Sequence, residues 1–242
     1  LPMTVDEHHV GQLYTVAKQS VDETDGKKAV EILINQPYDD NDPNDLFRAN
    51  GRDEAADGDA AATLNPSAVA ASKASRTQLS LEKRSGQYTH KVYHVGPSLP
   101  SFIRAILPSS VQRMYEIAWN SYPYCRTVLG NEYLQDAFQI VVETLHVDDG
   151  GEGENVFGLT GEKLKAREVV YLDLAEDQNE AAPEYRACHD PRKFRSVKTG
   201  RGPLQPGWQQ SAKPLMCVYK LVTIQFKYWG LQSTVERTTA EV

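Results

Sequence analysis

An ammonium and a hydroxyl stand on one face of the strand-like segment Gln87–Val95. Because side chains alternate between the two faces of a strand, Thr89 and Lys91 project to the same side, roughly 7 Å apart at the usual strand rise. An ammonium binds phosphate oxygens, and a hydroxyl both donates to and accepts from a polyol. The pair could therefore hold a phosphate and a polyol together. The alternative, that Lys91 faces water on an exposed strand, stays open on spacing alone.

A basic, glycine-rich segment, Lys198–Pro203, is a second candidate for anion binding, since its backbone amides could surround an anion. An exposed loop with turn glycines explains it equally well. The histidines do not predict a metal site: His90 and His94 share a strand face but lie roughly 13 Å apart. Cys188–His189 has no second pair of metal-ligand residues elsewhere in the sequence to complete a site. We expect no metal and no cofactor.

The motifs of common enzyme classes are missing from the sequence. It contains no Gly-x-Ser-x-Gly nucleophile elbow, no Gly-x-x-x-x-Gly-Lys-Ser/Thr phosphate loop, and no Gly-x-Gly-x-x-Gly after a strand. No nucleophile–base pair is evident either. We therefore expect no catalytic residues.

Two further segments fit more than one role. In Phe138–Val147 one strand face is apolar apart from the hydroxyl of Thr144, which suits either a core wall or the inner wall of a lipid cavity. Tyr228 and Trp229 fall where a strand meets a helix. Aromatics with a polar edge favour the membrane interface, although a buried aromatic pair is the commoner explanation.

Composition narrows the classes of protein and the cellular locations that remain possible. The 242 residues are 40% hydrophobic and 24% charged, and the formal charge of −7 argues against general nucleic-acid binding. The apolar runs are too short to span a bilayer, and no signal-like leader opens the chain. The three widely spaced cysteines, Cys125, Cys188 and Cys217, fit a reducing cytosol better than a disulfide framework. We expect a cytoplasmic protein.

The elements that position these residues follow from capping and periodicity. Thr4–Glu7 has the pattern of a capping box, and apolar residues at helical spacing predict a helix over 5–20. Strands are predicted over 29–35, 87–95, 124–128, 138–147, 169–174 and 215–229. Further helices are predicted over 110–118, over 160–167 and from Leu231 onward. Many long strands with few helices favour an α+β fold, with a large sheet covered by helices.

Residues 39–85 differ from the rest of the chain. The segment is acidic at its start, rich in Ala and Ser in its middle and basic at its end, without sustained apolar periodicity. It has too few large apolar side chains to offset the entropy of ordering it. We predict a disordered insertion within one domain that spans 1–242.

Six blocks of the sequence together resemble the phosphatidylinositol transfer proteins. They occur in the family's order and cover most of the chain outside 39–85: Thr4–Tyr14, Gly86–His94, Ala118–Thr127, Lys198–Leu204, Met216–Val222 and Phe226–Gln232. The resemblance implies a START-like, helix-grip fold, in which a concave, mainly antiparallel sheet and helices enclose one phospholipid. It also implies a monomer that carries phosphatidylinositol, exchanges it for phosphatidylcholine and visits membranes transiently.

The same resemblance implies roles for individual residues. The positions that match the family's headgroup contacts are Thr89, Lys91, Asn120 and Thr144. Cys125 matches a cysteine that lines the cavity, and Tyr228–Trp229 corresponds to a tryptophan pair that docks on membranes. Ser196 matches a phosphorylatable serine in a regulatory loop.

The sequence also departs from the family's pattern. Residues 39–85 are mostly an insertion, the first strand is expected to be truncated, and the long final helix that closes the cavity is expected to be missing after Val242. The tyrosine at position 228 resembles the branch of the family that forms a domain of larger multidomain proteins. The cysteine at position 125 instead resembles the branch of small single-domain proteins. The main alternative to lipid transfer is therefore a lipid-sensing adaptor domain that regulates phosphoinositide signalling. A lipid hydrolase is a third hypothesis.

Overall fold

The computed structural model describes residues 1–24, 30–39, 41, 85–94, 112–134, 137–176, 180–182 and 185–226. Most of the predicted insertion 39–85, the helix predicted from Leu231 and the pair Tyr228–Trp229 lie outside the described residues.

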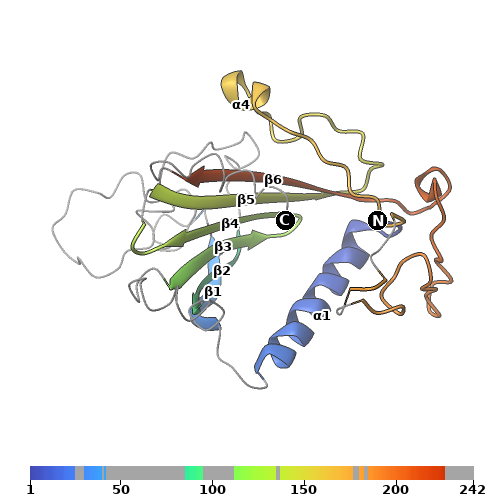
Figure 1. Cartoon of the computed structure of the whole chain (residues 1–242), viewed down its shortest axis with the longest axis horizontal. Coiled ribbons are helices and arrows are strands. Elements are labelled where there is room, and N and C mark those ends of the chain that lie inside the picture. The colour runs from blue at the N-terminus through green and yellow to red at the C-terminus, as the bar shows by residue number, and fades with distance from the viewer. Residues whose placement is uncertain are drawn as a thin grey trace.

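A single antiparallel sheet dominates the described part of the chain. It has six strands in the order β1-β2-β3-β4-β5-β6, so each strand pairs with the next one along the chain (Figure 1). The strands are β1 Val30–Asp39, β2 Ser85–His94, β3 Arg113–Ser121, β4 Tyr124–Asn131, β5 Phe138–Val147 and β6 Cys217–Phe226. The predicted α+β class with a mainly antiparallel sheet is confirmed.

One long helix, α1 Val5–Thr24, and two short helical elements accompany the sheet: α4 Gly161–Lys165 and the 3₁₀ turn η4 Trp208–Gln210. The predicted capping box starts α1. The hydroxyl of Thr4 accepts a hydrogen bond from the N–H of Glu7 at 3.1 Å, and the Glu7 carboxylate accepts one from the N–H of Thr4 at 2.9 Å. Both donors would otherwise lack a partner in the first turn.

One predicted helix is a strand in the structure. The sequence predicts a helix over 110–118, but Arg113–Ser121 forms β3. Tyr115, Ile117 and Trp119 alternate along this segment, and as a strand all three become buried between β2 and β4. Burial of these three large side chains outweighs the helical spacing of the smaller apolar residues around them.

The strand predicted over 169–174 is also wrong. These residues form no strand, and the side chains from Val169 to Leu172 are exposed. The β-branched composition is favourable, but no strand among the described residues pairs with the segment. A strand needs a neighbour to satisfy its backbone groups, so composition alone does not make one.

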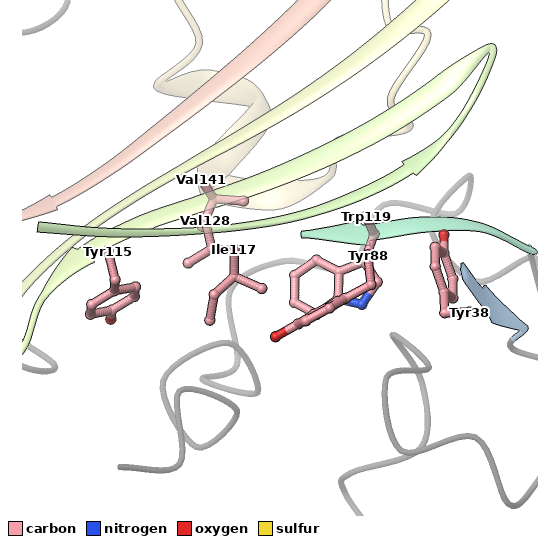
Figure 2. Packing of buried hydrophobic residues seen from close by; sticks show 7 residues of the cluster. All are labelled: Tyr38, Tyr88, Tyr115, Ile117, Trp119, Val128 and Val141. Atoms are coloured by element: carbon pink, nitrogen blue, oxygen red, sulfur yellow. The ribbon is translucent and has the colours of Figure 1, made fainter. Parts of the chain in front are cut away.

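Alternate side chains of the sheet form a buried face. Figure 2 shows its core cluster on one side of the strands: Tyr38, Tyr88, Tyr115, Ile117, Trp119, Val128 and Val141. The side chains of Ile117 and Val128 have no exposed area. A Cβ at Gly130 would collide with the ring of Tyr115, so only glycine leaves room for this ring across β4.

The other set of alternate side chains forms what we call the open face. It includes Thr89, Lys91, Glu116, Ala118, Asn120, Cys125, Thr127, Leu129, Ile140, Val142, Thr144, Lys220, Val222 and Ile224. All of these residues are half-buried or exposed. The sheet therefore has one face packed as a core and one face left accessible to a ligand.

The first turn of α1 is attached to the sheet by stacked rings. The ring centroid of His9 lies 4.0 Å from that of Tyr122, and the ring of His8 lies 4.8 Å from that of His146. The Tyr122 hydroxyl also donates to the carbonyl of Val5 at 2.8 Å. Because His146 follows Thr144 by two residues on β5, this attachment lies on the side of the open face.

An ion pair holds the same turn from a second direction. The Arg201 guanidinium donates to both carboxylate oxygens of Glu7, at 2.8 and 3.1 Å. Farther along α1, the side chains of Val10, Leu13 and Tyr14 are 57–70% exposed. The helix is thus fixed at its N-terminal end, while the apolar side chains of its next turns remain accessible.

Lowering the pH should weaken the attachment of α1 to the sheet and so destabilise the folded protein. Burial and nearby imidazoles lower the pKa of His8, and burial is the main cause that lowers the pKa of His146. The unfolded chain then binds protons first as the pH falls, so the free energy of unfolding should decrease below about pH 6.5 and recover above it. Thermal melting between about pH 7.5 and pH 5.5 measures this.

The variant His146→Gln should show a smaller loss of melting temperature in acid, since it removes one of the buried imidazoles. Part of the loss should remain, because burial also lowers the pKa of His90 on the opposite face. His189→Gln, on an exposed loop, is the matched control and should follow the wild type. A melting temperature that does not change with pH would contradict the prediction.

Candidate functional site

One cross-strand row at an end of the open face is polar, and we call it the polar row. The strand register pairs its members in sequence across β2 to β6: Gln87, Asn120, Cys125, Thr144 and Lys220. Neighbouring strands lie about 4.8 Å apart, so adjacent members of the row are within reach of one another. The Cys125 thiol, for example, donates to the side-chain oxygen of Asn120 at 2.9 Å.

Thr89 and Lys91 extend this polar region along β2. Thr89 pairs with Ala118, so Asn120 is its diagonal neighbour on β3. Diagonal Cα atoms of this kind are about 7–8 Å apart, and one ligand group can touch both side chains. The sequence prediction that Thr89, Lys91 and Asn120 serve one site is therefore geometrically possible.

Lys91 has an ion-pair partner on the neighbouring strand, so it is not simply a solvated lysine. It pairs with Glu116 on β3, and its ammonium lies 2.9 Å from a Glu116 carboxylate oxygen. The hydroxyl of Tyr93 donates to the other carboxylate oxygen at 2.8 Å. An ammonium has three N–H donors, so the ion pair fixes the position of Lys91 and leaves donors for a ligand.

Thr144 lies apart from this cluster. It stands three strands from Thr89, roughly 14 Å at the usual strand spacing, and its cross-strand neighbours are Cys125 and Lys220. Thr144 and Lys220 together offer a hydroxyl and an exposed ammonium. The predicted headgroup residues thus divide into two groups joined by Asn120 and Cys125.

The polar open-face residues that were not predicted from the sequence include Gln87, Glu116, Thr127 and Lys220. Lys220 lies in one of the blocks that resemble the transfer proteins, and strand alternation in that block places it with Val222. Glu116 could not be found in this way, because its segment was predicted to be a helix.

Apolar side chains occupy the open face on β4, β5 and β6 next to the polar row. Leu129, Ile140 and Ile224 lie in the cross-strand row of Lys91 and Glu116, and Val142 and Val222 lie in the row of Thr89. Val222 is 46% exposed. A molecule with an anionic, hydroxylated head and a long apolar remainder matches this division of the face.

Cys125 is chemically quiet in this setting. Burial raises the pKa of its thiol from 9.0 to about 11, so the thiol stays protonated and keeps its hydrogen bond to Asn120. A protonated thiol is a weak nucleophile. This fits a lining residue.

The loop with Ser196 lies beside the first turn of α1, to which Arg201 joins it. The Ser196 hydroxyl accepts a hydrogen bond from the N–H of Thr199 at 3.1 Å, and the Ser196 carbonyl accepts one from Gly200 at 2.8 Å. These amides are engaged within the loop, which disfavours the sequence hypothesis that they surround an anion.

The described residues offer neither a metal site nor a membrane-spanning helix. In this part of the chain, no cluster of three or more His, Cys, Asp or Glu side chains could hold a metal ion. No helix within it is long and apolar enough to cross a membrane.

Comparison with known proteins gives a match over the full length. The family model described as phosphatidylinositol transfer protein matches residues 1–242. The human phosphatidylinositol transfer protein beta isoform is 41% identical over 241 residues, which cover 98% of this chain and 74% of the relative. Phosphatidylinositol transfer protein 1 of Dictyostelium discoideum is 38% identical over 238 residues. The rat membrane-associated phosphatidylinositol transfer protein 1 is 38% identical over 247 residues, 16% of its length.

Thiol chemistry tests the environment of the polar row. Cys188 is exposed, whereas Cys125 is half-buried and has its pKa raised to about 11. Relative to a thiol of pKa 9.0, this lowers the thiolate fraction of Cys125 at neutral pH about 100-fold. Iodoacetamide should therefore modify Cys188 first and Cys125 last, as followed by peptide mass spectrometry. The variant Cys188→Ser removes the fast site and is the control; equal rates at both cysteines would contradict the assigned environment.

Proposed function

Because the chain belongs to the phosphatidylinositol transfer protein family, we propose that it binds one phosphatidylinositol molecule on the open face and carries it between membranes. The observation that supports this most directly is the shared face: Thr89, Lys91 and Asn120 lie on the same side of β2 and β3, and apolar side chains occupy that side on β4, β5 and β6. In this proposal the protein is a carrier without catalysis, monomeric and cytoplasmic, and its contact with membranes is transient.

The inositol ring would lie over β2 and β3. The hydroxyl of Thr89 and the amide of Asn120 can each donate and accept, as the ring hydroxyls require. Lys91 would donate to ring oxygens while its bond to Glu116 holds it in place. The free carboxylate lone pairs of Glu116 could accept hydrogen bonds from the ring.

The phosphate would lie toward β5 and β6. Thr144 and Lys220 are adjacent there, and Lys220 is exposed. The phosphate is common to phosphatidylinositol and phosphatidylcholine, whereas the inositol ring is not. We therefore propose that Thr144 and Lys220 serve both lipids, and that Thr89, Lys91 and Asn120 serve phosphatidylinositol alone.

The acyl chains would lie along the apolar rows of the open face. Burial of each CH₂ group contributes about 0.8 kcal/mol, so the chains supply most of the binding energy and the headgroup supplies selectivity. Catalysis requires none of these contacts. Tyr228 and Trp229 remain our candidates for membrane docking.

The adaptor hypothesis is favoured by one observation. The chain corresponds to 16% of the rat membrane-associated relative, which is therefore much longer. A lipid-binding domain within a long protein could regulate a partner rather than transfer lipid. Transfer predicts net movement of labelled lipid between vesicles, whereas an adaptor would bind lipid but move it slowly.

Lys91→Ala and Thr89→Asp should lower phosphatidylinositol transfer at least tenfold and change phosphatidylcholine transfer little. The first loses a charge-assisted hydrogen bond, worth about 1.5–3 kcal/mol, and the second replaces a hydroxyl that donates and accepts with a carboxylate that cannot donate to the ring hydroxyls. Transfer of each fluorescent lipid between vesicles measures the effect. Lys163→Ala, on exposed α4, is the matched control. A similar fall for both lipids with a lowered melting temperature would indicate a folding defect instead.

Lys220→Ala should lower the transfer of both lipids by a similar factor. A lysine that contacts only the shared phosphate makes the same contribution to each lipid. The ratio of the two transfer rates should therefore stay within about twofold of the wild type, in contrast to Lys91→Ala. A loss confined to one lipid would remove Lys220 from the phosphate site.

A further inference from the structure

The loop Lys193–Arg201 presents apolar side chains between cations. The side chain of Val197 is fully exposed and that of Phe194 is 51% exposed. Basic residues stand on both sides of each: Lys193, Arg195, Lys198 and Arg201. An exposed apolar patch surrounded by polar or charged residues can mark an interaction site.

The geometry of the loop is well defined. The N–H of Ser196 donates to the carbonyl of Arg201 at 2.8 Å, which closes the loop at its base. Gly202 has a φ of 80°, and a Cβ there would collide with the carbonyl of Phe194. The apolar side chains are therefore presented by a loop whose backbone is held in one shape.

The acidic residues around the loop are already paired. Glu180 binds Lys193 at 2.8 Å, Glu7 binds Arg201 at 2.8 Å, and Asp190 binds Arg192 at 2.9 Å. Within the described residues, no acidic group pairs with Arg195 or Lys198. Two unpaired cations thus flank the exposed Val197, although the whole chain carries a formal charge of −7.

We propose that the loop Lys193–Arg201 is a docking surface for an anionic lipid bilayer. Arg195 and Lys198 would approach the headgroups, while Val197 and Phe194 would enter the boundary between headgroups and acyl chains. The occupant is argued from charge complementarity, because an apolar tip between unpaired cations matches a surface that is anionic outside and apolar beneath. The loop also touches the first turn of α1 through Arg201, so it docks next to the open face.

Ser196 lies inside this surface, between Arg195 and Val197. A negative charge at this position would oppose the two unpaired cations and repel an anionic bilayer. A charged substitution at Ser196 therefore tests the role of charge in this loop without altering the residues of the open face.

The test uses the full chain and vesicles of phosphatidylcholine with or without phosphatidylserine, with binding measured by flotation. The double variant Arg195→Gln/Lys198→Gln should bind the phosphatidylserine vesicles about 25-fold more weakly, at roughly fivefold for each charge near the surface. Val197→Ser should weaken this binding too, through lost apolar insertion. The control Lys163→Gln/Lys213→Gln makes the same change in net charge at exposed positions elsewhere and should bind like the wild type.

A second pair of variants tests the role of charge at the centre of the loop. Ser196→Glu should bind phosphatidylserine vesicles several-fold more weakly than Ser196→Ala, and added salt should reduce the difference. Equal binding by the loop variants and the charge control, or binding that does not depend on phosphatidylserine, would overturn the proposal. That result would leave an acidic protein as the partner to examine.

This inference rests on the proposed transfer function, which requires contact with membranes, but the two can fail separately. Native mass spectrometry of the lipid that copurifies with the protein tests the proposed function. If no phosphatidylinositol copurifies with the wild-type protein, the proposed function is rejected. Phosphatidylinositol in all variants, together with unchanged vesicle binding, would reject the docking surface alone.

Discussion

The register of the antiparallel ladder determines what this protein can bind. Thr89, Lys91, Asn120, Cys125 and Thr144 come from four strands, and only their hydrogen-bonded register places them on the same face. A shift of one residue in any strand would move its contribution to the buried face. The buried face prevents such a shift, because Ile117, Trp119 and Val128 would then leave the core. Packing on one side of the sheet therefore fixes the chemistry on the other.

Charge on the open face is balanced within the sheet. Lys91 and Glu116 are cross-strand partners at 2.9 Å, and their side chains are 29% and 17% exposed. Neither charge has to be left alone in a half-buried position when no ligand is present. The pair also gives the face a fixed arrangement of donors and acceptors before any lipid arrives, which reduces the cost of ordering side chains on binding. Tyr93 contributes to this arrangement through its bond to Glu116.

Local signals in the sequence predicted several elements correctly. The capping box of α1, the strand Phe138–Val147 and the short helix near residue 160 were all found in this way. The failures at 110–118 and 169–174 have a common cause, since both segments depend on whether a neighbouring strand is available. Residue types and spacing suggested Thr89 and Lys91, but the family resemblance was needed for Asn120 and Cys125. Lys220 and Glu116 emerged only once the register was known, because a cross-strand neighbour is not visible in a linear pattern.

The order of strands also has a consequence for how the molecule folds. Every strand pairs with its neighbour in the sequence, but the connections between them are very unequal. β3 and β4 are joined by the two residues Tyr122 and Pro123, and β5 follows after a short link, whereas long segments precede β2 and β6. Low contact order favours early formation, so β3–β5 can assemble first, and the edge strands β1 and β6 join at a larger entropic cost. The half of the site on β3–β5 would then exist before Lys220 arrives, and the β6 edge would be the first part of the site to open when the sheet fluctuates.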